Sequence, residues 1–234
     1  MNDQDLLASL LEDVEATAGL LDSAPNASVV HCPGWTVEDV VAHHGGVLRW
    51  AEVVARTGEA VFEQYPPPDG RDGLRRWYVD AARRFAATVS ELDRDGPCWT
   101  FGRPPERVWF WIRRQALEAA VHRWDAELAT GVEYRIRSDV ASLGITEVVD
   151  DLFPRQLALG RSQALSSMTA VRADDIGQDW LVGPVEADAS SSSVEASAAV
   201  LLLLFWRRVQ VDDPRVHFSH DAVKDEWELA RFAP

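Results

Sequence analysis

The chain has 234 residues, of which 47% are hydrophobic, and this length fits one large domain or two small ones. Its formal charge of −15, from 38 acidic and 23 basic residues, argues against nucleic acid or an anionic membrane as the main partner. Its two cysteines are too few for a disulfide framework, and the N-terminus lacks the basic, apolar and small-residue order of a signal peptide, so a cytoplasmic protein is expected.

The first two predicted helices have clear periodicity and end signals. Apolar side chains between Asp3 and Leu21 recur with the 3.6-residue period of an amphipathic helix. Thr36 is a suitable N-cap for a second helix, and acidic residues follow it in the first turn. This helix is expected to end near Thr57, because Gly58 comes next and glycine commonly terminates helices.

A long connection separates the second helix from the next two. Residues 63–73 contain three consecutive prolines and two glycines, which predict a loop. A third helix is expected from about Leu74 to Leu92, and a fourth from about Glu106 to Thr130, with Pro104 and Pro105 at its first turn. Four helices with one long connection predict a four-helix bundle, here assigned to residues 1–135.

The remainder, residues 136–234, has the mixed pattern of a small α+β domain. A helical stretch is predicted near residues 140–150, and the alternating segments 169–172 and 180–182 predict strands. The small polar residues 188–193 are interpreted as a turn or loop, followed by an apolar helix over residues 194–206.

Three features are expected to serve packing. The ten tryptophans most simply fill the core between helices. Gly45 and Gly46 lie within the predicted second helix, where small residues allow close helix packing. The most apolar run, residues 198–206, is far shorter than the roughly 20 residues that a membrane-spanning helix needs, so we expect it to be buried in the core.

A candidate metal site arises from two of the predicted bundle helices. Glu118 and His122 are four residues apart, and this spacing places both side chains on one face of the fourth helix. A third ligand has to come from elsewhere, and the second helix offers His43 and His44. Two histidines and one glutamate would leave a coordination position for water or substrate. The competing interpretation is an ordinary polar pair, which is common at this spacing.

Two neighbouring residues have alternative interpretations. Asp125 can accept a hydrogen bond from His122, or it can form an ion pair with Arg123 or Arg114. Cys32 precedes a turn and a helix start, a setting that favours a thiolate. No Cys-His-Asn order accompanies this cysteine, so we interpret it as a small buried residue of the connection.

Several motifs together resemble the mycothiol-dependent maleylpyruvate isomerase family of actinobacteria, which belongs to the DinB-like superfamily. They are residues 32–37 (CPGWTV), 41–47 (VAHHGGV) and 118–125 (EAAVHRWD), joined by the apolar helix motif of residues 201–208 (LLLLFWRR). The resemblance covers nearly the whole chain. It implies an α-helical DinB-like four-helix bundle followed by a small α+β C-terminal domain.

The resemblance also implies the ligands of a metal ion. The family pattern of one histidine on the second helix and Glu-x-x-x-His on the fourth falls on His43, Glu118 and His122. The pattern places its first ligand directly after Ala42, and consecutive helical residues point about 100° apart, so His43 is preferred to His44. The implied ion is zinc or another divalent transition metal, since ligand type alone does not choose among them.

The activity that the resemblance implies is thiol activation. We expect a metal- and mycothiol-dependent enzyme that directs a low-molecular-weight thiol at an electrophilic small molecule, with maleylpyruvate cis–trans isomerisation as the example. Arg207 and Arg208 are expected to contact a carboxylate of substrate or thiol, although basic residues also commonly end apolar helices. A thiol S-transferase that keeps the adduct is the alternative enzyme. A non-catalytic metal-binding regulatory or stress protein is the alternative of another class.

Overall fold

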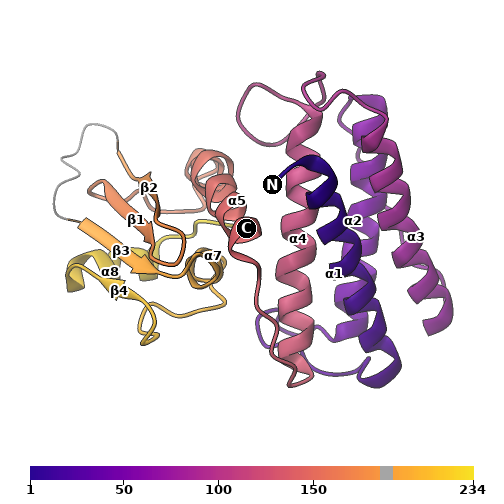
Figure 1. The fold of residues 1–234 in the computed structure, drawn as a ribbon, viewed down its shortest axis with the longest axis horizontal. Coiled ribbons are helices and arrows are strands. Elements are labelled where there is room, and N and C mark those ends of the chain that lie inside the picture. The colour runs from indigo at the N-terminus through magenta and orange to yellow at the C-terminus, as the bar shows by residue number, and fades with distance from the viewer. Residues whose placement is uncertain (185–191) are drawn as a thin grey trace. The chain divides into compact units, whose positions relative to one another are not determined.

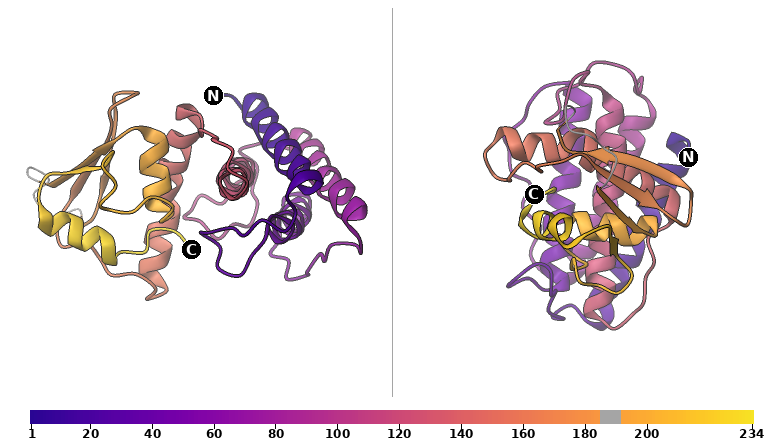
Figure 2. Two further views of the ribbon diagram at one scale, coloured as in Figure 1. Left: turned by 90° about the horizontal axis from the view of Figure 1, so that it is seen from below. Right: turned by 90° about the vertical axis from the view of Figure 1, so that its left-hand side faces the viewer.

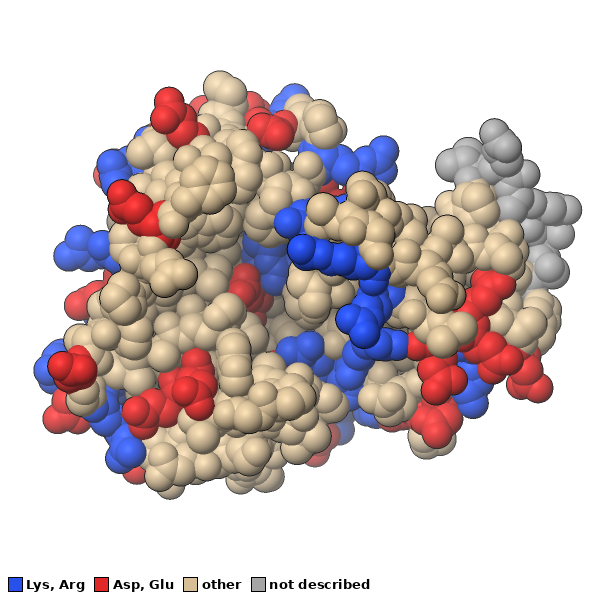
Figure 3. All heavy atoms as spheres, turned by 180° about the vertical axis from the view of Figure 1, so that it is seen from behind, with Lys and Arg blue, Asp and Glu red and all other residues tan. Residues whose placement is uncertain are grey.

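A computed structural model of the chain describes residues 1–184 and 192–234. The chain divides into two compact units, Met1–Ile136 and Arg137–Pro234. The first is a helical bundle and the second combines helices with a small sheet (Figure 1), so the predicted fold class is confirmed. Figure 3 shows acidic and basic side chains spread over one face of the molecule.

Four long helices run side by side in the N-terminal unit (Figures 1 and 2). Their apolar faces meet in a core in which α2 packs against α3 and α1 packs against α4. The helices are α1 (Asp3–Ser23), α2 (Val37–Thr57), α3 (Arg71–Ser90) and α4 (Val108–Ala129).

Local signals fix both ends of α2. The hydroxyl of Thr36 accepts a hydrogen bond from the main-chain N–H of Asp39 at 3.3 Å, and the Asp39 carboxylate accepts one from the N–H of Thr36 at 2.8 Å. Gly58 ends the helix with a φ of 73°, in the left-handed region that favours glycine. The predicted limits of this helix are therefore confirmed, and they place the adjacent pair His43 and His44 in its second turn.

Gly45 allows α2 and α3 to approach closely, as expected. A Cβ atom at this position would lie only 2.2 Å from the ring of Trp77 on α3. Gly46 faces a different neighbour, because a Cβ there would lie 3.1 Å from the main-chain oxygen of Tyr65 in the connection that follows α2. The glycine pair thus brings both a helix and a loop against α2.

The start of α4 differs from the prediction. The helix begins at Val108, so Pro104 and Pro105 lie in the preceding loop and not in its first turn. The reason is a main-chain contact that sequence periodicity does not show. Arg107 is extended and forms a bridge with Pro97, so the chain becomes helical only after it.

The C-terminal unit contains a four-stranded mixed sheet. The strand order is β2-β1-β3-β4, with β1 antiparallel to β2, β1 parallel to β3, and β3 antiparallel to β4. The elements are α5 (Ser138–Glu147), a π-helical turn (Val148–Leu152), α6 (Phe153–Ala158), β1 (Thr169–Ala173), β2 (Gln178–Val182), β3 (Ser192–Ala196), α7 (Ala198–Phe205), β4 (His217–Phe218) and α8 (Asp221–Leu229).

The helix predicted over residues 194–206 is wrong in its first turn. Ser192–Ala196 forms strand β3, in which Val194 pairs with Val171 of β1, and α7 begins only at Ala198. Pairing on both sides of β3 outweighs the helical tendency of this segment. Of the predicted loop at 188–193, residues 188–191 lie outside the described part of the chain.

The apolar run is buried, as predicted. Seven side chains of α7 are buried, including all five from Leu201 to Phe205. Within residues 1–184 and 192–234, no helix combines the length and apolar content that crossing a membrane requires.

Candidate metal centre

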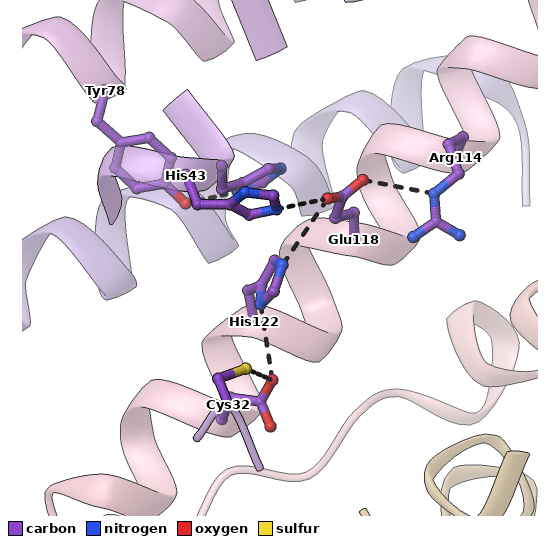
Figure 4. Close-up of polar contacts among 8 residues, drawn as sticks. Cys32, His43, Tyr78, Arg114, Glu118 and His122 are labelled. Carbon is purple, nitrogen blue, oxygen red and sulfur yellow. Dashed lines mark hydrogen bonds and ion pairs between the residues drawn. The ribbon is translucent and has the colours of Figure 1, made fainter. Parts of the chain in front are cut away.

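Helices α2 and α4 bring His43, Glu118 and His122 together (Figure 4). Each offers one donor atom, and these three atoms lie within 4.8 Å of one another. Nε2 of His43 is 3.5 Å from Oε1 of Glu118, and Nε2 of His122 is 3.7 Å from the same oxygen. Both histidines therefore direct a nitrogen toward one carboxylate oxygen.

This geometry fits a metal ion better than a hydrogen-bonded cluster. Both nitrogen–oxygen separations exceed the usual 2.7–3.2 Å of a hydrogen bond. They are close to the roughly 3.3 Å that separates two ligands placed about 2.0 Å from a tetrahedral zinc. The side chains of Glu118 and His122 are 16% and 11% exposed, whereas that of His43 is 39% exposed, so the cluster is open at the His43 side.

The charge state of Glu118 suits a metal ligand. Burial raises the pKa of this carboxyl, but contacts with His122 and His43 and the charge of Arg114 outweigh burial and hold the pKa well below 4.5. Nε of Arg114 lies 3.5 Å from Oε2 of Glu118, on the oxygen that does not face the histidines. Glu118 is consequently ionised, as a ligand must be.

A neighbouring carboxylate faces the other nitrogen of His122. Oδ2 of Asp125 lies 3.6 Å from Nδ1 of His122, and burial, which lowers the pKa of this imidazole, is outweighed by Asp125 and Glu118. A carboxylate in this position can orient a ligating histidine. Arg123, an alternative partner predicted for Asp125, forms an ion pair with Asp13 at 3.1 Å.

Cys32 lies beside the cluster and is half-buried, so its interpretation as a buried residue of the connection is wrong. Its Sγ is 3.9 Å from Oδ2 of Asp125, and Cys32, His122 and Asp125 form a second group of donors within 4.8 Å of one another. The turn that carries Cys32 also places the ring of Trp35 4.9 Å from that of His43. The only sequence signal was position, since this turn immediately precedes the helix that carries His43.

His44 lies beside the candidate cluster, with its ring centre 5.7 Å from that of His122, but its Nδ1 is directed into the bundle. Its Nδ1 forms a 2.9 Å hydrogen bond with the hydroxyl of Tyr78 on α3, and its side chain is fully buried. Burial lowers the pKa of His44 from 6.5 to about 3, although Glu118 opposes this shift. His44 therefore packs between α2 and α3 through its contact with Tyr78.

Buried neutral His44 makes the protein sensitive to acid. Between pH 6.5 and about 3 the unfolded chain takes up a proton at this residue and the folded chain does not, so stability is lost as pH falls. We expect this residue to remove about 2 kcal/mol from the free energy of unfolding between pH 7 and pH 5. In urea titrations, the free energy of unfolding of a His44→Gln variant should fall about 2 kcal/mol less than that of the wild type over this range. An exposed-site control, His217→Gln, should lose as much as the wild type, and equal losses in all three proteins would contradict the assignment.

Arg207 and Arg208 lie in the second unit, at the end of α7. Arg207 has a φ of 58°, which ends the helix, and its guanidinium donates to the main-chain oxygen of Glu228. Arg208 donates to the main-chain oxygen of Trp206 at 2.9 Å. Their predicted contact with a ligand carboxylate stays a prediction.

The bundle sequence identifies a family. Residues 7–127 match the mycothiol maleylpyruvate isomerase N-terminal domain, and this match spans more than half of the chain. The chain belongs to this family. The predicted resemblance to the maleylpyruvate isomerase family is confirmed, and His43, Glu118 and His122 all fall within the matched residues.

Solved structures share the fold of this maleylpyruvate isomerase family member. A crystal structure of the mycothiol-dependent maleylpyruvate isomerase matches with a TM-score of 0.64 and 14% identity, covering 94% of this chain and 93% of that chain. A histidine-to-alanine variant of that isomerase matches with a TM-score of 0.61 and 14% identity, covering 87% of this chain and 88% of that chain. At this identity the likeness establishes the fold alone. No curated protein matches the sequence.

Proposed function

We propose that the protein is a metal-dependent enzyme that activates mycothiol for attack on an electrophilic small molecule, with maleylpyruvate cis–trans isomerisation as the leading reaction. The observation that carries this proposal is the cluster of His43, Glu118 and His122, closed on the α4 side and open beside His43. Membership of the isomerase family and the shared fold support it.

The three side chains would hold zinc or another divalent transition metal. Such an ion supplies thiol activation, because the thiolate is the form that coordinates metal and acts as nucleophile. Contacts with His122 and His43 and the charge of Arg114 keep Glu118 ionised, and Arg114 faces its second oxygen. Asp125 would orient His122 through its other nitrogen. The thiol would reach the ion from the side of His43, which is the most exposed of the three side chains.

The proposed isomerisation needs no net consumption of thiol. The sulfur adds to one carbon of the conjugated double bond, the resulting single bond rotates, and the carbon–sulfur bond breaks to restore the double bond in the trans form. An S-transferase would use the same first step but keep the adduct. The isomerase name of the matching family favours release. Arg207 and Arg208 are proposed to bind a carboxylate of one of the two reactants.

The test compares zinc-loaded protein, chelator-treated protein and reloaded protein, each with and without mycothiol, on maleylpyruvate. We expect cis–trans conversion only when zinc and thiol are both present, with free thiol unchanged at the end. Stoichiometric loss of thiol would instead indicate S-transfer. Zinc binding without thiol binding or turnover would indicate a non-catalytic metal protein, and the enzymatic proposal would be rejected.

A further inference from the structure

A second group of potential metal ligands lies on the side of His122 that faces away from Glu118 (Figure 4). It consists of Cys32, His122 and Asp125, whose donor atoms lie within 4.8 Å of one another. The group shares His122 with the proposed metal centre but uses the other ring nitrogen, since Nδ1 faces Asp125 whereas Nε2 faces Glu118. One imidazole therefore stands between two sets of ligands.

The separations within this second group suit metal ligation. Oδ2 of Asp125 lies 3.6 Å from Nδ1 of His122 and 3.9 Å from Sγ of Cys32. Around a tetrahedral zinc, with bonds of about 2.0 Å to nitrogen or oxygen and about 2.3 Å to sulfur, the corresponding separations are roughly 3.3 and 3.5 Å. Both pairs are therefore within about half an ångström of ligand geometry.

Nδ1 of His122 is the atom that points most directly to a bound ion. His122 is 9% exposed as a whole residue, and this nitrogen is buried and makes no hydrogen bond with any described residue. The carboxylate of Asp125 faces it, but 3.6 Å is too long for a hydrogen bond between nitrogen and oxygen. A buried polar atom without a hydrogen bond is unfavourable, and coordination to a metal ion would satisfy it.

Two ordered elements hold the group in place. His122 and Asp125 are three residues apart on α4, which puts both side chains on one face of the helix. Cys32 belongs to the turn before α2, where its main-chain N–H donates to the oxygen of Val29 at 3.1 Å and its own oxygen accepts from the N–H of Trp35 at 2.9 Å. Cys32 is half-buried, so an ion can reach the group from its side.

The ligand types and the charge balance define the kind of ion. Cys32 coordinates metal as a thiolate, and His122 can bridge two ions only after Nδ1 loses its hydrogen. Each of these two groups gives one proton to the solvent, so a divalent cation enters without changing the net charge of this buried region. A set of thiolate, imidazole and carboxylate favours zinc or a similar transition metal over calcium or magnesium.

We propose that Cys32, His122 and Asp125 form a second metal site, which holds zinc or another thiolate-binding divalent transition metal and is joined to the first site through His122. The first site fills before the second, because only the second requires the loss of two protons. Toward an ion at the first site, Asp125 only orients His122. The proposal rests on the proposed metal centre through the sharing of His122 and is independent of the thiol chemistry.

Cobalt(II) tests the proposal, because a sulfur–cobalt bond gives a near-ultraviolet charge-transfer band that nitrogen and oxygen ligands do not give. Metal-free wild-type protein in an anaerobic buffer without thiols should bind two equivalents, and the band should appear with the second. Cys32→Ser should lose the band and the second equivalent, while the first equivalent binds as in the wild type. Cys98→Ser changes the other cysteine, which lies outside the group, and should behave like the wild type.

Variants of the first site separate this proposal from the proposed metal centre. In Glu118→Gln the sulfur band should appear with the first equivalent added, and His122→Ala should weaken both sites. One equivalent without the band, weakened in Glu118→Gln, would overturn the second site and leave the metal centre standing. A second equivalent that persists in Cys32→Ser would also overturn the second site. A single equivalent that carries the band and is unaffected by Glu118→Gln, or no binding at all, would overturn both.

Discussion

Replacing Glu118 by glutamine is expected to lower zinc affinity by more than about 100-fold, since even residues that only orient metal ligands contribute 10- to 100-fold. Glu118 lies nearest to both histidine nitrogens and is the only negative charge among the three proposed ligands. The glutamine amide keeps the size of the side chain but removes that charge, which in the wild type also faces the Arg114 guanidinium at 3.5 Å. Competition with a chromophoric chelator at fixed pH gives the affinity, and circular dichroism checks that the bundle remains folded.

Two further variants compare the loss of zinc affinity on removing a ligand with the loss on removing a residue that only orients one. Removal of a neutral ligand in His122→Ala should also lower zinc affinity by more than about 100-fold, whereas Asp125→Asn, which only alters the orientation of His122, should lower it by about 10- to 100-fold. Glu59→Gln changes the net charge equally at an exposed position outside the cluster and should leave zinc affinity unchanged. Zinc bound by Glu118→Gln within threefold of the wild-type affinity would contradict the assignment of this cluster as the metal centre.

Replacing Trp111 by alanine is expected to reduce the free energy of unfolding by about 3–5 kcal/mol, the range for large aromatic truncations in a core. Trp111 is fully buried on α4, and its indole N–H donates to the main-chain oxygen of Trp99 at 2.8 Å. Its ring also lies 4.9 Å from that of Trp50, which lines a pocket beside His43. Truncation would therefore leave a cavity and remove the indole hydrogen bond to the Trp99 carbonyl, which would keep only the weak bond from the Cys98 thiol at 3.6 Å. Urea titration followed by circular dichroism measures the change.

Trp109 provides the matched control on the same helix. It is half-buried, and its ring contacts the Arg94 guanidinium at 4.1 Å. Alanine at this position should cost roughly 1 kcal/mol, in the range of a partly exposed cation–π contact. If Trp111→Ala is no more destabilised than Trp109→Ala, the aromatic cluster beneath the pocket is not a main source of bundle stability.

Part of the candidate metal cluster could be predicted from residue spacing alone. The spacing of Glu118 and His122 already placed both on one face of a helix, because side chains at i and i+4 are neighbours in any α-helix. Which histidine of α2 would join them depended on the family resemblance. In the folded chain His43 faces Glu118, while its neighbour His44 is rotated toward Tyr78.

Some limits of the helices and strands could be predicted from nearby residues, and others depend on contacts with distant parts of the chain. The limits of α2 were predictable because Thr36 and Gly58 act on their own main-chain neighbours. Strand β3 could not be predicted from its own residues, because its conformation depends on pairing with β1 and β4. The start of α4 likewise depends on the bridge between Arg107 and Pro97.

The sequence by itself determined the helical bundle, the later α+β unit, the caps of α2 and the i,i+4 pair on α4, since these follow from periodicity and from contacts within a few residues. Tertiary structure alone decided that Cys32 lies beside Asp125 and His122, and that the connection at Tyr65 closes a pocket beside His43. Such contacts join segments far apart in the chain, and their geometry depends on the packing of whole helices and on glycines that let main chains approach.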